Sequence, residues 1–343
     1  MSGAESRAAH PRGNPHLVGH LRAEKRVLEA LGSGRAHHAW LLSGPRGIGK
    51  ATFAYHMARF LLSNPQGAAR GAEGLGMDEN HPVFRQVAAA AHPGLFELVP
   101  SSERKTRVIS VEEARRLLRF TAMTATDGGW RVAIIDAAED MNASSANALL
   151  KVLEEPPEGV MFLLVSHSPG QLLPTIRSRC LHLPLRPLTA AQVREALALL
   201  DMGLDEETLE RAARLARGAP GRAVALALSE AAAAFERFRD MASGGGPYDR
   251  AIVTPIIRQL AAASAREDFT LFCELLGEWM METAAHHGRH GHGAAARRWS
   301  ELAGEAASLV ARTQAYNLDR GQMLSVIMRR AEALPVAGLP QSS

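Results

Sequence analysis

The sequence has few cysteines, few aromatic residues and no long hydrophobic run. Its two cysteines, Cys180 and Cys273, lie far apart in 343 residues. So few and such distant cysteines are typical of proteins in a reducing compartment. We therefore expect two thiols rather than a disulfide. No stretch approaches the roughly 20 apolar residues that a membrane-spanning helix needs. Residues 1–13 are polar without an apolar core, so we expect a disordered tail there and not a signal peptide. These absences predict a cytoplasmic protein without a membrane partner.

Lysine is also scarce, although the chain is basic overall. The 39 Lys and Arg residues include only Lys25, Lys50, Lys105 and Lys151, and the net charge is +3. This small excess excludes a protein that coats DNA through a strongly basic surface, but it permits a local basic patch. Hydrophobic residues make up 46% and charged residues 22%, as in ordinary globular proteins of two or three domains.

A glycine-rich segment at residues 43–52 is the most informative stretch of the chain. It follows an apolar run at 38–42 that is typical of a buried strand, and it precedes a helical apolar pattern at 53–62. Strand, glycine-rich turn and helix form the context of a phosphate-binding loop, in which backbone N–H groups and one lysine surround phosphate oxygens. The candidate nucleotide-binding residues are Gly44, Pro45, Arg46, Gly47, Ile48, Gly49, Lys50, Ala51 and Thr52.

The loop departs from a working nucleotide site at one position. A Ser or Thr normally follows the lysine, because its hydroxyl coordinates magnesium. Here Ala51 follows. Thr52 comes one residue later, where a helix turns its side chain about 100° away. We expect weak binding of ATP or ADP without hydrolysis, and a glycine-rich turn without any nucleotide is the alternative.

An acidic residue supplies the second candidate nucleotide motif. Asp136 ends an apolar run at 130–136 and fits the acid that helps to hold magnesium. In hydrolysing proteins of this architecture a glutamate follows, to activate water. Ala137 occupies that position here, and Glu139 lies two residues too late. Each motif therefore lacks one chemical group, which argues against intrinsic hydrolysis.

Apolar runs alternate with helical patterns through the first half of the chain. Such unbroken runs suit parallel strands that are covered on both faces, so the alternation predicts an α/β fold with a parallel sheet. Residues 63–76, rich in Gly and Ala, are expected to form an exposed loop with little core. The expected strands are residues 38–42, 95–99, 130–136, 160–165 and 181–183, and the expected helices are 14–33, 53–62, 81–91, 111–121 and 142–153.

Beyond residue 187 the sequence contains no convincing strand. Helices are expected from Thr189, from Asp205 and over 220–241, and again over 249–334 with an interruption at 286–293. That interruption contains His286, His287, His290 and His292. These side chains suit a metal, but nothing fixes a ligand geometry, so a polar loop and no metal site are expected.

Two segments resemble subunits of the clamp-loader AAA+ family of bacterial DNA polymerase III. They read A-N-A-L-L-K-V-L-E-E-P-P at residues 146–157 and L-P-T-I-R-S-R-C at residues 173–180. The resemblance covers residues 14–228 well, and the degenerate nucleotide motifs favour a non-motor subunit. It implies a RecA-like AAA+ domain at 14–186, a helical lid at 187–242, a linker at 243–248, a helical collar at 249–335 and a tail at 336–343.

The resemblance also implies a role for Arg179 and a set of partners. The run from Ser178 to Cys180 matches the family's arginine-finger motif, so Arg179 would reach into the ATP site of a neighbouring motor subunit. The implied partners are the gamma or tau ATPases and the delta subunit. The sliding clamp would be contacted indirectly, and primed DNA would be bound within the complex.

Two further departures from the family bear on cofactors and activity. The family often carries a four-cysteine zinc module after the phosphate-loop helix, but residues 63–92 contain no cysteine, so no zinc is expected there. Motor subunits carry a lid arginine whose position falls here on Gly221, with Arg222 one place late. Two alternatives stay open: an active ATPase of the gamma or tau kind, and a stand-alone DNA-binding AAA+ protein.

Overall fold

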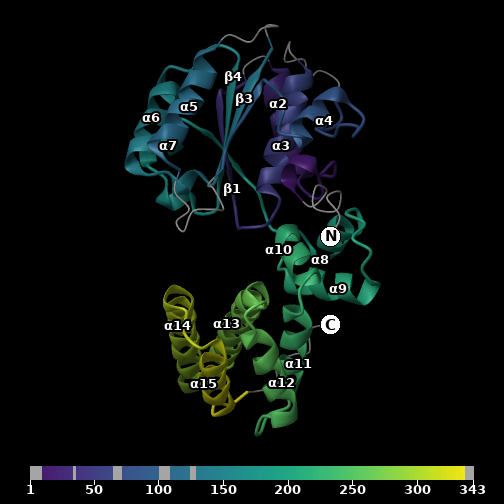
Figure 1. The fold of residues 1–343 in the computed structure, drawn as a ribbon, viewed down its shortest axis with the longest axis vertical. Helices are drawn as coiled ribbons and strands as arrows, with labels where there is room; N and C mark the ends of the chain where they lie inside the picture. Colours follow the sequence, from purple (N-terminus) through teal and green to yellow (C-terminus); the bar gives the residue numbers. More distant parts are fainter. Residues whose placement is uncertain (1–9, 34–35, 65–71, 100–108, 124–128, 337–343) are drawn as a thin grey trace. The chain divides into compact units, whose positions relative to one another are not determined.

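The computed structural model describes residues 10–33, 36–64, 72–99, 109–123 and 129–336. The chain divides into two compact units, Met1–Val224 and Ala225–Ser343 (Figure 1). Within the described ranges, every strand lies in the first unit. This confirms the predicted α/β fold followed by an all-helical region. The finer division into AAA+ domain, lid and collar stays a prediction.

A five-stranded parallel sheet forms the centre of the first unit, in the order β2-β3-β4-β1-β5. Ala39 of β1 pairs with Phe162 of β4, and Trp40 of β1 pairs with Leu181 of β5. All five predicted strands are present, and all of their pairings are parallel. Their bounds are β1 Ala39–Ser43, β2 Leu95–Leu98, β3 Arg131–Asp136, β4 Val160–Ser166 and β5 Leu181–Pro184.

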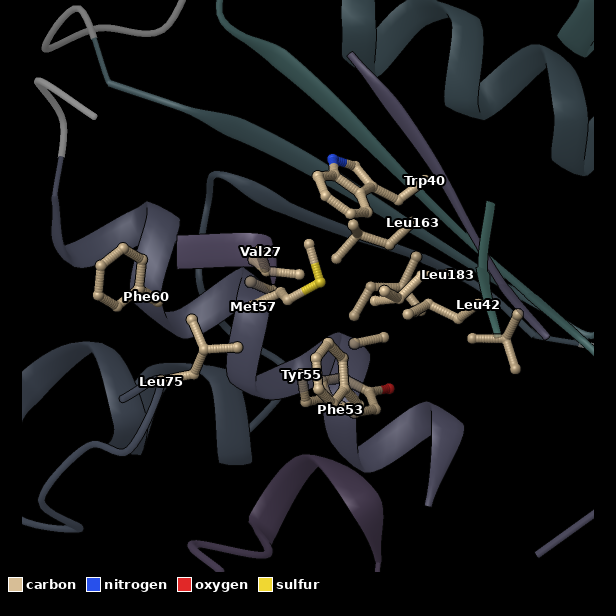
Figure 2. Close-up of a cluster of buried hydrophobic side chains, with 14 of the residues drawn as sticks. Val27, Trp40, Leu42, Phe53, Tyr55, Met57, Phe60, Leu75, Leu163 and Leu183 are labelled. Carbon is tan, nitrogen blue, oxygen red and sulfur yellow. The ribbon is translucent and has the colours of Figure 1, made fainter. Parts of the chain in front are cut away.

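Helices cover both faces of this sheet, which explains the unbroken apolar runs of its strands. Trp40 and Leu42 of β1 belong to the same hydrophobic cluster as Met57 on one face (Figure 2), whereas Leu41 belongs to the core of the other face. Successive strand residues therefore serve alternate faces. In Figure 1, one face carries α2 (Leu21–Gly32), α3 (Lys50–Ser63) and α4 (Pro82–Ala88), and the other carries α5 (Val111–Ala122), α6 (Ala143–Glu154) and α7 (Pro174–Arg177).

The helix predicted over residues 14–33 begins only at Leu21, and this part of the prediction is wrong. Gly19 has a φ of 85°, which interrupts a helix, and a Cβ there would lie 2.4 Å from Leu188 Cδ2. The preceding segment instead contacts α3, where buried Arg59 donates from Nη2 to the Asn14 carbonyl oxygen at 2.8 Å. A short 3₁₀ turn, η1 (Pro11–Gly13), occupies part of the expected disordered tail. Residues 1–9 lie outside the described ranges.

The segment expected to be an exposed loop at 63–76 contributes one residue to the core. Leu75 is fully buried, and its backbone N–H donates to Glu24 Oε1 at 2.5 Å. Residues 65–71 lie outside the described ranges. The expectation of little core is therefore wrong at Leu75, whose glycine neighbours conceal it in the sequence.

The helices after the last strand begin where their capping residues predict. Thr189 and Gln192 form a reciprocal capping box at α8 (Ala190–Ala198), and Asp205 caps α9 (Glu206–Leu215). The helix predicted over 220–241 is instead two helices, α10 (Pro220–Ala227) and α11 (Ala231–Ser243). The break between them contains Ser229, whose hydroxyl accepts from the N–H of Ala231, the first residue of α11, at 3.3 Å.

The second unit is a helical assembly around an aromatic core. The rings of Trp279 and Trp299 lie 5.1 Å apart edge to face, and Phe238 lies 5.7 Å from Trp279, a favourable arrangement for aromatic pairs. No helix within the described ranges has both the length and the apolar character to cross a membrane. Besides α11, this unit contains α12 (Arg250–Ala261), α13 (Arg266–Arg289), α14 (Gly293–Tyr316) and α15 (Arg320–Glu332).

The expected polar loop at residues 286–293 is mostly helical, so that prediction is wrong. Helix α13 continues to Arg289 and α14 begins at Gly293. His287 is buried, and its Nε2 lies 2.9 Å from the carbonyl oxygen of Pro335. Trp299 Nε1 donates to the same oxygen at 2.9 Å. Because a carbonyl oxygen only accepts, His287 carries its proton on Nε2 and helps to fix residue 335 against the helices.

Replacing His287 by alanine is expected to lower the free energy of unfolding by about 2–3 kcal/mol, since it removes a buried ring and one hydrogen bond. Urea unfolding of the whole chain measures this change. His290→Ala is the matched control, because that ring is exposed and should change stability by less than about 0.5 kcal/mol. Equal stability of the two variants would contradict the assigned contact.

Candidate functional site

The phosphate-loop segment joins the carboxyl end of β1 to the first residue of α3, as its sequence predicts. Gly44, Gly47 and Gly49 have φ values of 147°, 78° and 97°, which side-chain-bearing residues rarely adopt. Gly49 is the N-cap residue of α3. Pro45 and Arg46 are exposed, Ile48 and Lys50 are buried, and Ala51, Thr52 and Asp136 are half-buried.

Lys50 is directed to the loop's own backbone. Its Nζ donates to the carbonyl oxygens of Gly44 at 2.8 Å and Pro45 at 2.6 Å, and the residue is only 3% exposed. Burial lowers the pKa of Lys50 to about 8, although the charges of Asp136 and Glu139 oppose this effect. The structure thus brings Lys50 and Asp136, one charged residue from each predicted motif, close enough for their charges to interact.

Two other elements hold carbonyl groups of the same loop. His20 Nε2 lies 2.8 Å from the Ile48 oxygen, and the Gly221 N–H donates to the Gly47 oxygen at 2.8 Å. A Cβ on Gly221 would lie only 3.3 Å from Gly47 Cα. Gly221 therefore meets the loop through its backbone alone. Sequence patterns give no signal for His20, because it lies 28 residues before Ile48.

One carboxylate oxygen of Glu139 accepts hydrogen bonds from two backbone donors. Glu139 lies in η2 (Ala138–Asp140), and its Oε1 accepts from the N–H groups of His167 at 2.7 Å and Ser168 at 3.2 Å. Burial alone would raise the pKa of Glu139, but these and related hydrogen bonds outweigh it and lower the pKa. Glu139 therefore serves as an ionised acceptor that ties η2 to the end of β4.

Arg179 lies at the opposite edge of the sheet from the phosphate loop. The loop follows the carboxyl end of β1, whereas Arg179 precedes the amino end of β5 by two residues. These strands are parallel neighbours, with Trp40 opposite Leu181. The two ends are thus separated by about 13 Å, the length of a four-residue strand. Arg179 consequently lies away from its own chain's phosphate loop.

Two groups of the same chain contact the Arg179 guanidinium. Nη2 lies 2.8 Å from Glu154 Oε1, and Nη1 donates to the Thr175 carbonyl oxygen at 3.0 Å. The adjacent thiol of Cys180 is free, and burial raises its pKa to about 12, so it is unreactive at neutral pH. Cys273 is also a free thiol. Glu154 is a second site residue that sequence patterns miss, because it lies 25 residues before Arg179.

No group of three or more His, Cys, Asp or Glu side chains in the described ranges is arranged to hold a metal ion. The four histidines of residues 286–292 are therefore distributed over a helix end and a turn without forming a ligand set, and His287 is buried in its contact with Pro335.

Comparisons with known proteins match the region that contains this site. A family model described as "DNA polymerase III, delta subunit" matches residues 19–189. DNA polymerase III subunit delta' of Pseudomonas aeruginosa is 42% identical over 189 residues, which are 54% of this chain and 55% of that protein. Subunit delta' of Yersinia pestis is 38% identical over 44% of this chain and 42% of its own length.

Subunit tau of Escherichia coli K12 is 33% identical over 276 residues, which are 78% of this chain and 40% of that protein. The chain thus spans about half the length, or less, of the relatives that it matches.

Proposed function

We propose that the chain belongs to the clamp-loader AAA+ family of DNA polymerase III, since the relatives that it matches include delta' subunits, and that it is the delta prime-type, non-motor subunit of a clamp loader. It would support ATP-driven loading of the sliding clamp onto primed DNA during replication. Its own turnover of ATP would be negligible, and Arg179 would complete the ATP site of a neighbouring motor subunit.

The observation that carries this proposal is the placement of Arg179. The residue lies at the amino edge of the sheet, whereas the phosphate loop of the same chain lies at the carboxyl edge. An arginine finger acts by placing a planar, permanently charged group against the phosphoryl group that is transferred. A finger at the far edge of the sheet is suited to a nucleotide bound by another subunit.

The state of the chain's own pocket supports the non-motor role. Ala51 brings no magnesium ligand, Ala137 occupies the position of the catalytic carboxylate, and Glu139 is held by backbone N–H groups. Gly221 brings no side chain to the loop. A nucleotide bound here would rely on Lys50, on the loop N–H groups and on Asp136. We propose weak binding of ATP or ADP at most.

The proposed partners are the gamma or tau ATPases and the delta subunit. The sliding clamp would be contacted indirectly, and primed DNA would be bound only within the assembly. Residues 14–186 would form the AAA+ domain, residues 187–242 the lid and residues 249–335 the collar through which the subunits assemble.

A second candidate function is an active ATPase of the gamma or tau kind. It is favoured by the 33% identity to a tau subunit over 78% of this chain, which is a longer match than those to the delta' subunits. It requires that Thr52 or another group replace the missing magnesium ligand.

Calorimetric titration of the isolated chain with ATP, with and without magnesium, separates these two functions. We expect weak binding that is largely independent of magnesium, together with negligible hydrolysis, because the loop lacks the hydroxyl that couples nucleotide to metal. Tight binding that collapses on chelation, or turnover at the rate of known motor subunits, would favour the active ATPase.

A further inference from the structure

The ion pair between Arg179 and Glu154 joins two elements that are otherwise separate in sequence. Glu154 is the last residue of α6, and Thr175, which accepts from Nη1, lies in α7. The guanidinium is therefore held between the ends of two helices, with Nη2 2.8 Å from Glu154 Oε1. A pair of contacts on different nitrogens fixes the plane of the group as well as its position.

These contacts leave much of the guanidinium available to a ligand. A guanidinium has five N–H donors, and the two contacts use one on each terminal nitrogen. The Arg179 side chain remains 35% exposed. The group is thus oriented without being enclosed, as a finger that must meet a second subunit requires.

We propose that Glu154 is a positioning residue for Arg179, which holds the guanidinium in the orientation that the neighbouring ATP site needs. This inference rests on the proposed function, because it presupposes that Arg179 acts in trans. A free arginine side chain samples many rotamers, and holding it in advance reduces the entropy lost when it meets the phosphate. An exposed ion pair is weak, so Glu154 does not outcompete a phosphoryl group for the finger.

Glu155 provides a matched control. It is exposed, it follows Glu154 directly, and its substitution by glutamine makes the same change in charge. Its backbone N–H caps α6 through the Lys151 oxygen, and no ion pair of its side chain occurs in the described part of the chain. Glu155→Gln is therefore expected to leave ATP turnover unchanged.

The test compares clamp loaders reconstituted with each variant of the full chain, after gel filtration has verified assembly. DNA-stimulated ATP turnover is measured in complexes whose other ATP sites have been inactivated. Glu154→Gln is expected to lower kcat by about two- to fivefold, the range that an exposed ion pair supports, with little change in the KM for ATP. Glu154→Asp should restore part of the loss, and Glu154→Gln should add nothing in an Arg179→Ala background.

The outcomes separate this inference from the proposed function. If Arg179→Ala itself leaves turnover unchanged, the trans finger is rejected. If Arg179→Ala lowers turnover while Glu154→Gln matches the wild type or exceeds it, only the positioning role is overturned. A further loss on adding Glu154→Gln to Arg179→Ala would also overturn it, because Glu154 would then act on another group.

Discussion

Replacement of Arg179 by alanine is expected to lower ATP turnover at the adjoining site by about 10³-fold or more, since arginine fingers contribute 10³–10⁵ to the rate of phosphoryl transfer. The fold and the assembly of the complex should be unaffected, because the side chain is 35% exposed and its ion pair with Glu154 is also partly exposed. Clamp loading should fall together with turnover. The measurement is DNA-stimulated turnover by a reconstituted complex in which only the adjoining ATP site is active.

Arg177→Ala is the matched control for this substitution. Arg177 lies two residues earlier, at the end of α7, and its side chain is exposed. Loss of the same charge there should leave turnover near the wild-type value. Unchanged turnover in a normally assembled Arg179→Ala complex would reject the finger. Failure of that variant to assemble would instead support a structural ion pair at a subunit contact.

Gly44→Ala is expected to destabilise the chain by about 3 kcal/mol or more, with or without nucleotide. A Cβ at this position would lie 2.5 Å from the Leu185 carbonyl oxygen and 2.6 Å from Ile48 Cδ1, and the φ of 147° is one that L-residues rarely adopt. Neither clash can be relieved unless backbone or core atoms move. The substitution should therefore cause an unusually large loss in the free energy of unfolding. Urea unfolding of the variant in nucleotide-free buffer measures it.

Gly170→Ala is the control for this prediction. Gly170 lies in η3 (Pro169–Gln171), and a Cβ there would meet nothing within 4 Å. Its substitution should change stability by less than about 0.5 kcal/mol. If Gly44→Ala proved equally mild, the loop would not be required by the fold. A large loss would instead explain how the loop keeps its shape in a chain that has Ala51 after the loop lysine and Ala137 after Asp136.

Local sequence patterns predicted the sheet because each of its strands is recognisable from its own run of apolar residues. The runs at β1, β3 and β4 are apolar without alternation, which only a sheet covered on both faces explains. Helix starts were also predictable, as at Thr189 and Asp205, since a capping side chain bonds to its own first turn. In these cases the interaction that determines the structure spans only a few residues.

Predictions failed where a distant contact decides the local structure. Residues 14–20 leave the helical pattern because Gly19 breaks it and Arg59, 45 residues away, binds Asn14. Helix α13 continues past residue 285 to Arg289, and its His287 bonds to Pro335, 48 residues away. At the site, the spacing of residues revealed which chemical groups are absent. It did not reveal that Glu139 is held by His167 or that Glu154 holds Arg179.

The most direct test of the proposed role is to purify the tagged chain from its native source at moderate salt and to identify the proteins that accompany it by mass spectrometry. We expect recovery of the gamma or tau ATPase and of the delta subunit in one complex that resists DNase. Recovery of the chain alone, or in a homo-oligomer that hydrolyses ATP without other subunits, would contradict it.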